Sequence, residues 1–171
     1  MNPALKKIYP SAGFPKHWFG ETFDDYTNMV ASKKDKIVKV LQNLPEQPIK
    51  VMIYGPAAPI VTELLEGGRF LSNVRGVDFS SYFKKSFNKE AVVMASSSID
   101  VVVIYNVGLE PAINTAYSQK LLKGLVSEYR NCDAHVFIQT DLDRVFFETN
   151  YDVRLASRIS VKPLEDENVF A

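Results

Sequence analysis

The sequence contains very little cysteine and no excess of charge of either sign. Its single cysteine, Cys132, excludes an intrachain disulfide and a cysteine-rich zinc site. Twenty lysines and arginines balance twenty aspartates and glutamates, which disfavours a globally basic nucleic-acid-binding protein but not a local basic patch. No apolar run approaches the roughly 18 residues that span a membrane, and residues 1–14 lack the apolar core of a secretory signal. These absences predict a cytoplasmic protein with no membrane contact.

Apolar side chains are nevertheless abundant. They make up 46% of the 171 residues, and charged residues make up 23%. A chain with this composition and no net charge can bury a full core, which excludes a disordered protein. We expect residues 1–31, which are rich in proline and aromatic residues, to form an irregular arm whose aromatic side chains pack on the body. Residues 32–171 are expected to form a single domain.

Apolar runs alternate with amphipathic stretches along this domain. The runs at 49–55, 99–108 and 134–140 predict strands that are buried on both faces, as in a parallel sheet covered by helices. A last strand is expected at 158–162. Helices are predicted at 32–44, about 60–66, about 78–87, about 114–130 and 152–157. This alternation predicts an α/β fold with three layers, in which a parallel sheet of about five strands lies between two layers of helices.

The strand at 49–55 ends in a glycine and precedes a helix, an arrangement that invites comparison with the P-loop G-x-x-x-x-G-K-[ST]. In that loop, backbone amides wrap the phosphates, the lysine reaches the terminal phosphates and the hydroxyl holds Mg²⁺. Aligned from Gly55, the sequence has Ile60 at the second glycine, Val61 at the lysine and Thr62 at the hydroxyl. We expect a loop of similar shape without phosphate chemistry, and Thr62 as a helix-start hydroxyl rather than a metal ligand.

The strand at 99–108 shows the same kind of loss. A strand of the Walker B type should end in one or two acids that hold Mg²⁺ and polarise the attacking water. Tyr105 and Asn106 stand there instead, and neither carries a charge at neutral pH. Losses at two correctly ordered places indicate a degenerate nucleotide-binding fold, with no cofactor, no metal site and no catalytic residues.

Five segments follow one another in an order and spacing that are specific together. They are FPKHWFGETFDDY at 14–26, VMIYGPAAP at 51–59, VVVIYNVGLEP at 101–111, QKLLKGLVSEYRNCDAHVFIQTDLD at 119–143 and DVRLASRI at 152–159. These segments resemble the ATPase domain of the DnaC/DnaI-type helicase loaders, a branch of AAA+ proteins that includes IstB-like transposition helpers. The resemblance covers most of the chain and implies a P-loop NTPase-like (AAA+) fold for residues 32–171.

The resemblance also implies roles for residues and partners. Asp141 stands near the polar sensor-1 position, and Arg154 and Arg158 match arginines that reach a neighbouring subunit's nucleotide in loaders. The alternative for both arginines is that they only cap and solubilise the last helix. The implied protein is a pseudo-ATPase of DNA replication that binds a replicative helicase, a helicase loader or single-stranded DNA, as a homo- or hetero-oligomer. It would assist or block helicase loading, and a phage or mobile-element origin would suit such a stripped copy.

Two other functions stay open. One is a stand-alone single-stranded nucleic-acid-binding protein, because basic and aromatic residues interleave between 69 and 89 and suit backbone charge and base stacking. The candidate contacts are Arg69, Arg75, Lys84, Lys85 and Lys89. Their alternative is that the aromatic side chains are core and the lysines are solvated. The other function is a working ATPase with replacement residues, which the loss of three charged groups disfavours.

Overall fold

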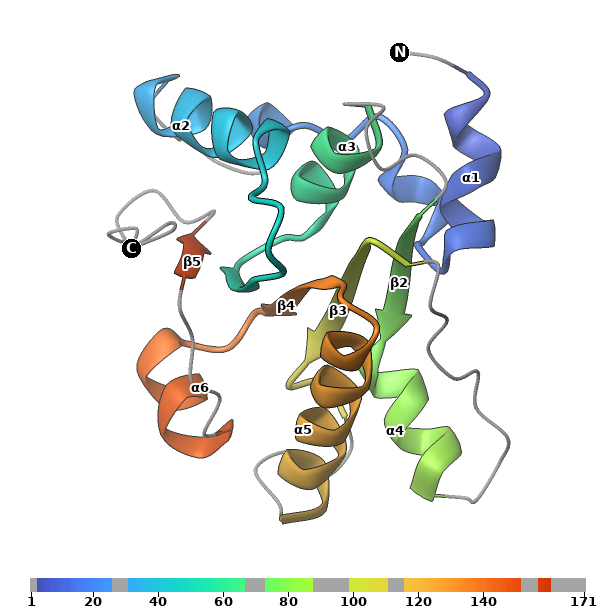
Figure 1. Ribbon diagram of the computed structural model, residues 1–171, viewed down its shortest axis with the longest axis vertical. Helices are drawn as coiled ribbons and strands as arrows, with labels where there is room; N and C mark the ends of the chain where they lie inside the picture. The colour runs from blue at the N-terminus through green and yellow to red at the C-terminus, as the bar shows by residue number, and fades with distance from the viewer. Residues whose placement is uncertain are drawn as a thin grey trace.

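A five-stranded sheet in which every pair of neighbouring strands is parallel forms the middle of the molecule (Figure 1). The computed structural model describes residues 3–25, 31–66, 73–87, 99–110, 116–151 and 157–160. The strands are β1 (Lys50–Tyr54), β2 (Val74–Asp78), β3 (Val101–Val107), β4 (His135–Thr140) and β5 (Ser157–Ser160). Their order across the sheet is β2-β3-β4-β1-β5, so β4 lies between the strand that precedes Gly55 and the strand that carries Tyr105.

Helices cover both faces of this sheet (Figure 1). One face packs against α1 (Leu5–Ala12), α2 (Ala31–Gln42), α3 (Ala58–Glu66) and the short 3₁₀ helices η1 (Lys16–Trp18) and η2 (Phe23–Asp25). The other face packs against α4 (Phe79–Phe87), α5 (Ala116–Asn131) and α6 (Arg144–Tyr151). Among the described ranges, no helix has both the length and the apolar character needed to span a membrane.

Alternate residues of the central strands serve two different cores. In β1, Val51 and Ile53 belong to the core under α1, α2 and α3, whereas Met52 and Tyr54 belong to the core under α4, α5 and α6. This follows from the period of two in a strand, which sends successive side chains to opposite faces. The prediction of a three-layer α/β domain with a parallel sheet of about five strands is therefore confirmed.

Within residues 32–171, two described elements were not predicted from the sequence. The edge strand β2 is only half-buried after Val74, so it does not form an apolar run like the central strands. The helix α6 begins directly after Asp143, whose Oδ1 accepts hydrogen bonds from the N–H groups of Val145 and Phe146 at 3.0 and 3.3 Å. The helix predicted at 152–157 lies outside the described residues except for its last position, which is in β5.

The N-terminal arm is not irregular throughout, because it contains α1 and two 3₁₀ helices. The helix α1 ends at Gly13, which has a φ of 99°. A Cβ atom at Gly13 would lie 2.2 Å from the carbonyl oxygen of Gly76 in β2, so glycine permits both the left-handed turn and the close packing of the arm on the sheet. The boundary predicted after residue 31 stays a prediction, since residues 26–30 lie outside the described ranges.

A buried carboxylate ties the end of β3 to the helices beside it. Glu110 is 3% exposed and accepts hydrogen bonds from the Gly108 N–H, from the Ser118 hydroxyl at 2.7 Å and from the Tyr151 hydroxyl at 2.8 Å. Ser118 belongs to α5 and Tyr151 to α6. One side chain therefore fixes two helices to the sheet edge at which the strands end.

We expect Glu110→Gln to lower the free energy of unfolding by about 2 kcal/mol, because an amide replaces a charged acceptor and turns its N–H₂ toward groups that donate. Urea unfolding followed by circular dichroism measures this loss. The matched control is Glu46→Gln at an exposed loop position, where a change within about 0.5 kcal/mol is expected. Equal stability of the two variants would show that the buried carboxylate contributes nothing.

Candidate functional site

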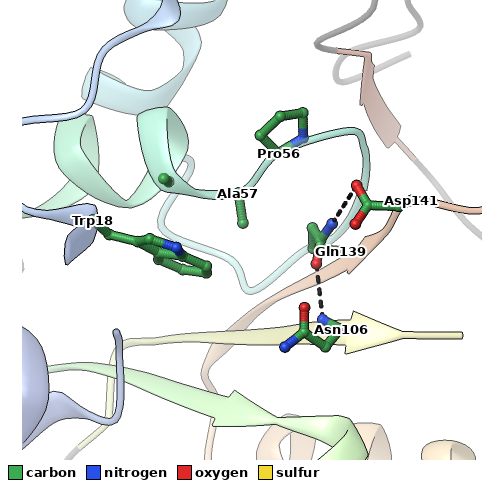
Figure 2. A pocket seen from close by; sticks show the side chains of 7 residues that line it. Trp18, Pro56, Ala57, Asn106, Gln139 and Asp141 are labelled. Atoms are coloured by element: carbon green, nitrogen blue, oxygen red, sulfur yellow. Dashed lines mark hydrogen bonds between the residues drawn. The ribbon is translucent and has the colours of Figure 1, made fainter. Parts of the chain in front are cut away.

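The carboxyl ends of β1, β3 and β4 meet at one edge of the sheet, which is where ligands bind in open α/β sheets. A pocket of about 250 Å³ lies there. Figure 2 shows its lining, which comprises Trp18, Pro56, Ala57, Ala58, Asn106, Gln139 and Asp141. The pocket includes the connection after β1 and the end of β3, so it occupies the place of the predicted nucleotide site.

The connection from β1 to α3 is shorter than a phosphate-binding loop. Only residues 55–57 lie between the two elements, because α3 already begins at Ala58. Gly55 has a φ of 113°, which allows the sharp turn, and its N–H donates to the Thr140 carbonyl oxygen at 3.0 Å. Pro56 has no N–H to offer. The expected persistence of the loop's shape is therefore wrong, because the aligned residues after position 57 are helical.

The residues aligned with the second glycine and the lysine lie in the core. Ile60 and Val61 are both 0% exposed and pack in the cluster that joins α1, α2 and α3 to the sheet. Neither residue lines the pocket. Helix formation from Ala58 onward thus turns the lysine position away from the sheet edge and into apolar surroundings.

Thr62 holds the N-terminal arm rather than the start of a helix. It is buried in the middle of α3, and its hydroxyl lies 3.1 Å from the Tyr9 hydroxyl and 3.5 Å from the Trp18 carbonyl oxygen. The expected helix-start role is wrong, because α3 begins four positions earlier at Ala58. Burial raises the pKa of Tyr9, so this phenol stays a neutral hydrogen-bonding group.

Tyr105 is also engaged by the arm. Its hydroxyl donates to the Gly13 carbonyl oxygen at 2.7 Å, and its ring centroid lies 4.8 Å from that of Trp18 and 6.1 Å from that of Phe14. Burial, together with the nearby Asp78 carboxylate, raises the pKa of the Tyr105 phenol well above its usual value. The residue at the first Walker B acid position is thus a neutral donor that anchors the arm.

Asn106 forms a β-bulge at the end of β3. Residues 104–107 of β3 lie opposite residues 138–140 of β4, so β3 carries one extra residue there. Asn106 has a φ of 61°, and its backbone N–H donates to Gln139 Oε1 at 2.8 Å. Its side-chain amide donates to Asp78 Oδ1 at 3.3 Å, and the same oxygen caps the N-terminus of α4.

Gln139, which belongs to neither the P-loop nor the Walker B motif, joins the three strand ends. It is 3% exposed, and its Nε2 donates to the Gly55 carbonyl oxygen at 2.9 Å. The same nitrogen donates to Asp141 Oδ1 at 3.3 Å (Figure 2). With the bond from Asn106, both ends of its amide are used. A signal was present, because a lone glutamine in the apolar run at 134–140 must find buried partners.

The predicted arginines of the last segment are only in part described. Arg158 lies in β5, where it pairs in register with Met52 of β1. Arg154 lies outside the described residues, and so do Arg69 and Lys89. The intersubunit role of Arg154 and Arg158 stays a prediction.

The other basic candidates lie away from the pocket. Arg75 is half-buried in β2 and close enough to Tyr129 to act on the pKa of that phenol. Lys84 and Lys85 are exposed in the last turn of α4. Among the described residues, no lysine or arginine lines the pocket, whereas Asp141 does.

We expect Val61→Lys to be less stable than Val61→Met by about 3 kcal/mol or more at pH 7, because only the lysine buries a charge in the core. Burial lowers the pKa of such a lysine, so the stability difference should shrink as pH rises toward about 10.4. Thermal and urea unfolding across pH measure this. Equal stability of both variants at every pH would contradict the buried position of residue 61.

No protein-family model matches the chain, and no curated protein matches it. Among solved structures, the chain is similar to the one described as the crystal structure of the DnaC helicase loader. The match covers 81% of this chain and 87% of that chain, with 12% sequence identity and a TM-score of 0.49. A likeness at this distance assigns no function to the chain.

Proposed function

We propose that this protein is a non-catalytic relative of the helicase loaders that acts in DNA replication by binding a replicative helicase or a helicase loader. The observation that carries the proposal is the burial of Val61, 0% exposed, at the position of the phosphate-binding lysine. The ordered sequence segments supply the connection to helicase loaders. The fold lacks the lysine and the acids that an ATPase uses, so binding a partner is a better-supported activity than hydrolysis.

The charge at the pocket supports the absence of ATP binding. A triphosphate needs cations around it, and the described lining offers the carboxylate of Asp141 instead. The N-terminus of α3 adds partial positive charge, but such a dipole contributes only about 0.3–1 kcal/mol at an exposed site. The short connection at residues 55–57 offers few amides, because Pro56 has none and the Gly55 N–H is bonded to Thr140.

The hydrogen bonding of the same edge supports a fold that is complete without nucleotide. Gln139 satisfies the bulge amide of Asn106, and Tyr105 is bonded to the arm. The Asn106 backbone N–H and the Tyr105 hydroxyl are thus both used within the chain.

A second candidate is a single-stranded nucleic-acid-binding protein. Lys84 and Lys85 are exposed at the end of α4, and Lys120 and Lys123 are exposed on the neighbouring α5. Two adjacent helices therefore present four lysines in a chain whose net charge is zero. Phosphate backbones favour such a local surface.

We expect isothermal titration calorimetry to detect no ATP binding to the wild-type protein at physiological nucleotide concentration, with or without Mg²⁺. The reason is that the lysine and both acids of the site are replaced. The pure protein should also remain a monomer or a small oligomer in light scattering, whether or not ATP is added. A micromolar dissociation constant, or hexamers that form only with ATP, would contradict the non-catalytic proposal.

We expect the protein to form a complex with a replicative helicase or its loader without nucleotide, as measured by size-exclusion chromatography with light scattering. Arg154→Ala with Arg158→Ala should weaken that complex at least several-fold if the arginines face the partner. The matched control is Lys84→Ala with Lys85→Ala, which removes two charges at the end of α4. A different result would favour the second candidate instead. In that case the protein binds neither partner, but it binds oligo(dT) with an affinity that falls with salt and falls again in Lys84→Ala with Lys85→Ala.

A further inference from the structure

The pocket at the sheet edge presents hydrogen-bond acceptors that no other described residue uses. Asn106 donates its side-chain amide to Asp78, and no hydrogen bond joins its Oδ1 to another described residue. Asp141 accepts from Gln139 through Oδ1, and its Oδ2 likewise has no bond to a described residue. Figure 2 shows the side-chain oxygen of Asn106 and the carboxylate of Asp141 bordering the same space.

An aromatic side chain forms the opposite wall. Trp18 lines the pocket across from Asp141 and is only half-buried, so its indole is accessible from the pocket (Figure 2). Its packing against Tyr105 and Phe14 fixes the ring in place, with centroid distances of 4.8 and 5.9 Å. Cations are attracted to the face of an indole ring, and the attraction is stronger for Trp than for other aromatic residues.

The charge balance of the pocket selects a cation over an anion. Its described lining holds one carboxylate and no lysine or arginine. The start of α3 contributes about half a positive charge, which is less than the full negative charge of Asp141. A phosphate group would meet this carboxylate at close range, whereas a cationic group would be attracted to the carboxylate and the indole together.

We propose that this pocket binds an arginine side chain of a partner protein. Arginine fits better than lysine, because its planar group carries several donors that can reach Asp141 Oδ2 and Asn106 Oδ1 while it stacks on Trp18. The volume of about 250 Å³ suits one side chain, since pockets that enclose drug-sized ligands measure about 300–1,000 Å³. This inference rests on the proposed function, because it names the chemistry of the partner at the same site.

The chain contains one tryptophan, so intrinsic fluorescence reports on the pocket directly. The wild-type protein is titrated with acetyl-Gly-Arg-Gly-amide, with the corresponding lysine peptide and with ATP, at constant ionic strength. We expect a saturable change with the arginine peptide, a weaker one with the lysine peptide and none with ATP. Asp141→Asn should weaken arginine-peptide binding about tenfold, as loss of a charged hydrogen-bond partner does.

The matched control is Asp133→Asn. Asp133 is exposed in the turn before β4, at the opposite edge of the sheet from Asp141. Asparagine tolerates its φ of 57°. This variant should bind the arginine peptide as the wild type does.

The outcomes separate the two proposals. No saturable change with the arginine peptide, or equal binding by Asp141→Asn and the wild type, would overturn the arginine site and leave the proposed function standing. A saturable change with ATP would instead overturn the non-catalytic function itself, whatever the result with the arginine peptide.

Discussion

The hydrogen bonds of Gln139 are the constraint on which the sheet edge depends. Three parallel strands end there, and a bulge at Asn106 leaves a backbone N–H without a ladder partner. An unpaired buried amide costs roughly 1–3 kcal/mol, and Gln139 removes that cost with Oε1 while its Nε2 holds the Gly55 carbonyl oxygen. The pocket thus has a floor of fixed geometry that needs no bound molecule.

The N-terminal arm completes the same edge from the other side. Trp18 and Phe14 pack beside Tyr105, and the arm is bonded to the body through Tyr105 and Thr62. The close approach of Gly13 to β2 lets the arm lie flat on the sheet. Because the arm forms one wall of the pocket, the position of the pocket's only tryptophan depends on contacts that are distributed over α1, α3 and β3.

The elements that were predicted best from the sequence are those whose formation depends on burial alone. The central strands β1, β3 and β4 are apolar on both faces, and such apolar runs predict buried strands directly. The edge strand β2 has no such run, because its sequence VRGVD contains Gly76 and two charged residues and its side chains after Val74 are only half-buried. Its pairing with β3 comes from tertiary contacts that no local pattern records.

The site shows the same division. Alignment with a motif located Gly55, Tyr105 and Asn106 at the correct edge of the sheet, since the order of strands and loops is a property of the chain. It did not show that α3 begins at Ala58, because helix starts depend on local packing as well as on residue type. Gln139 and Trp18 were not selected because neither belongs to the P-loop or Walker B motif, although both line the pocket.

The replacements at the two motif positions are linked by electrostatics. A lysine and a pair of acids at such a site are stabilised by the phosphates and metal between them, and each becomes a costly buried charge when no nucleotide binds. Loss of one group alone would leave the other unpaired, so neutral residues at all three positions form the consistent state. The Asp141 carboxylate does not carry the cost of a buried charge, because it is exposed and remains solvated. The charge that remains in the described lining of the pocket is therefore negative. A negative charge disfavours a phosphate and favours a cationic side chain.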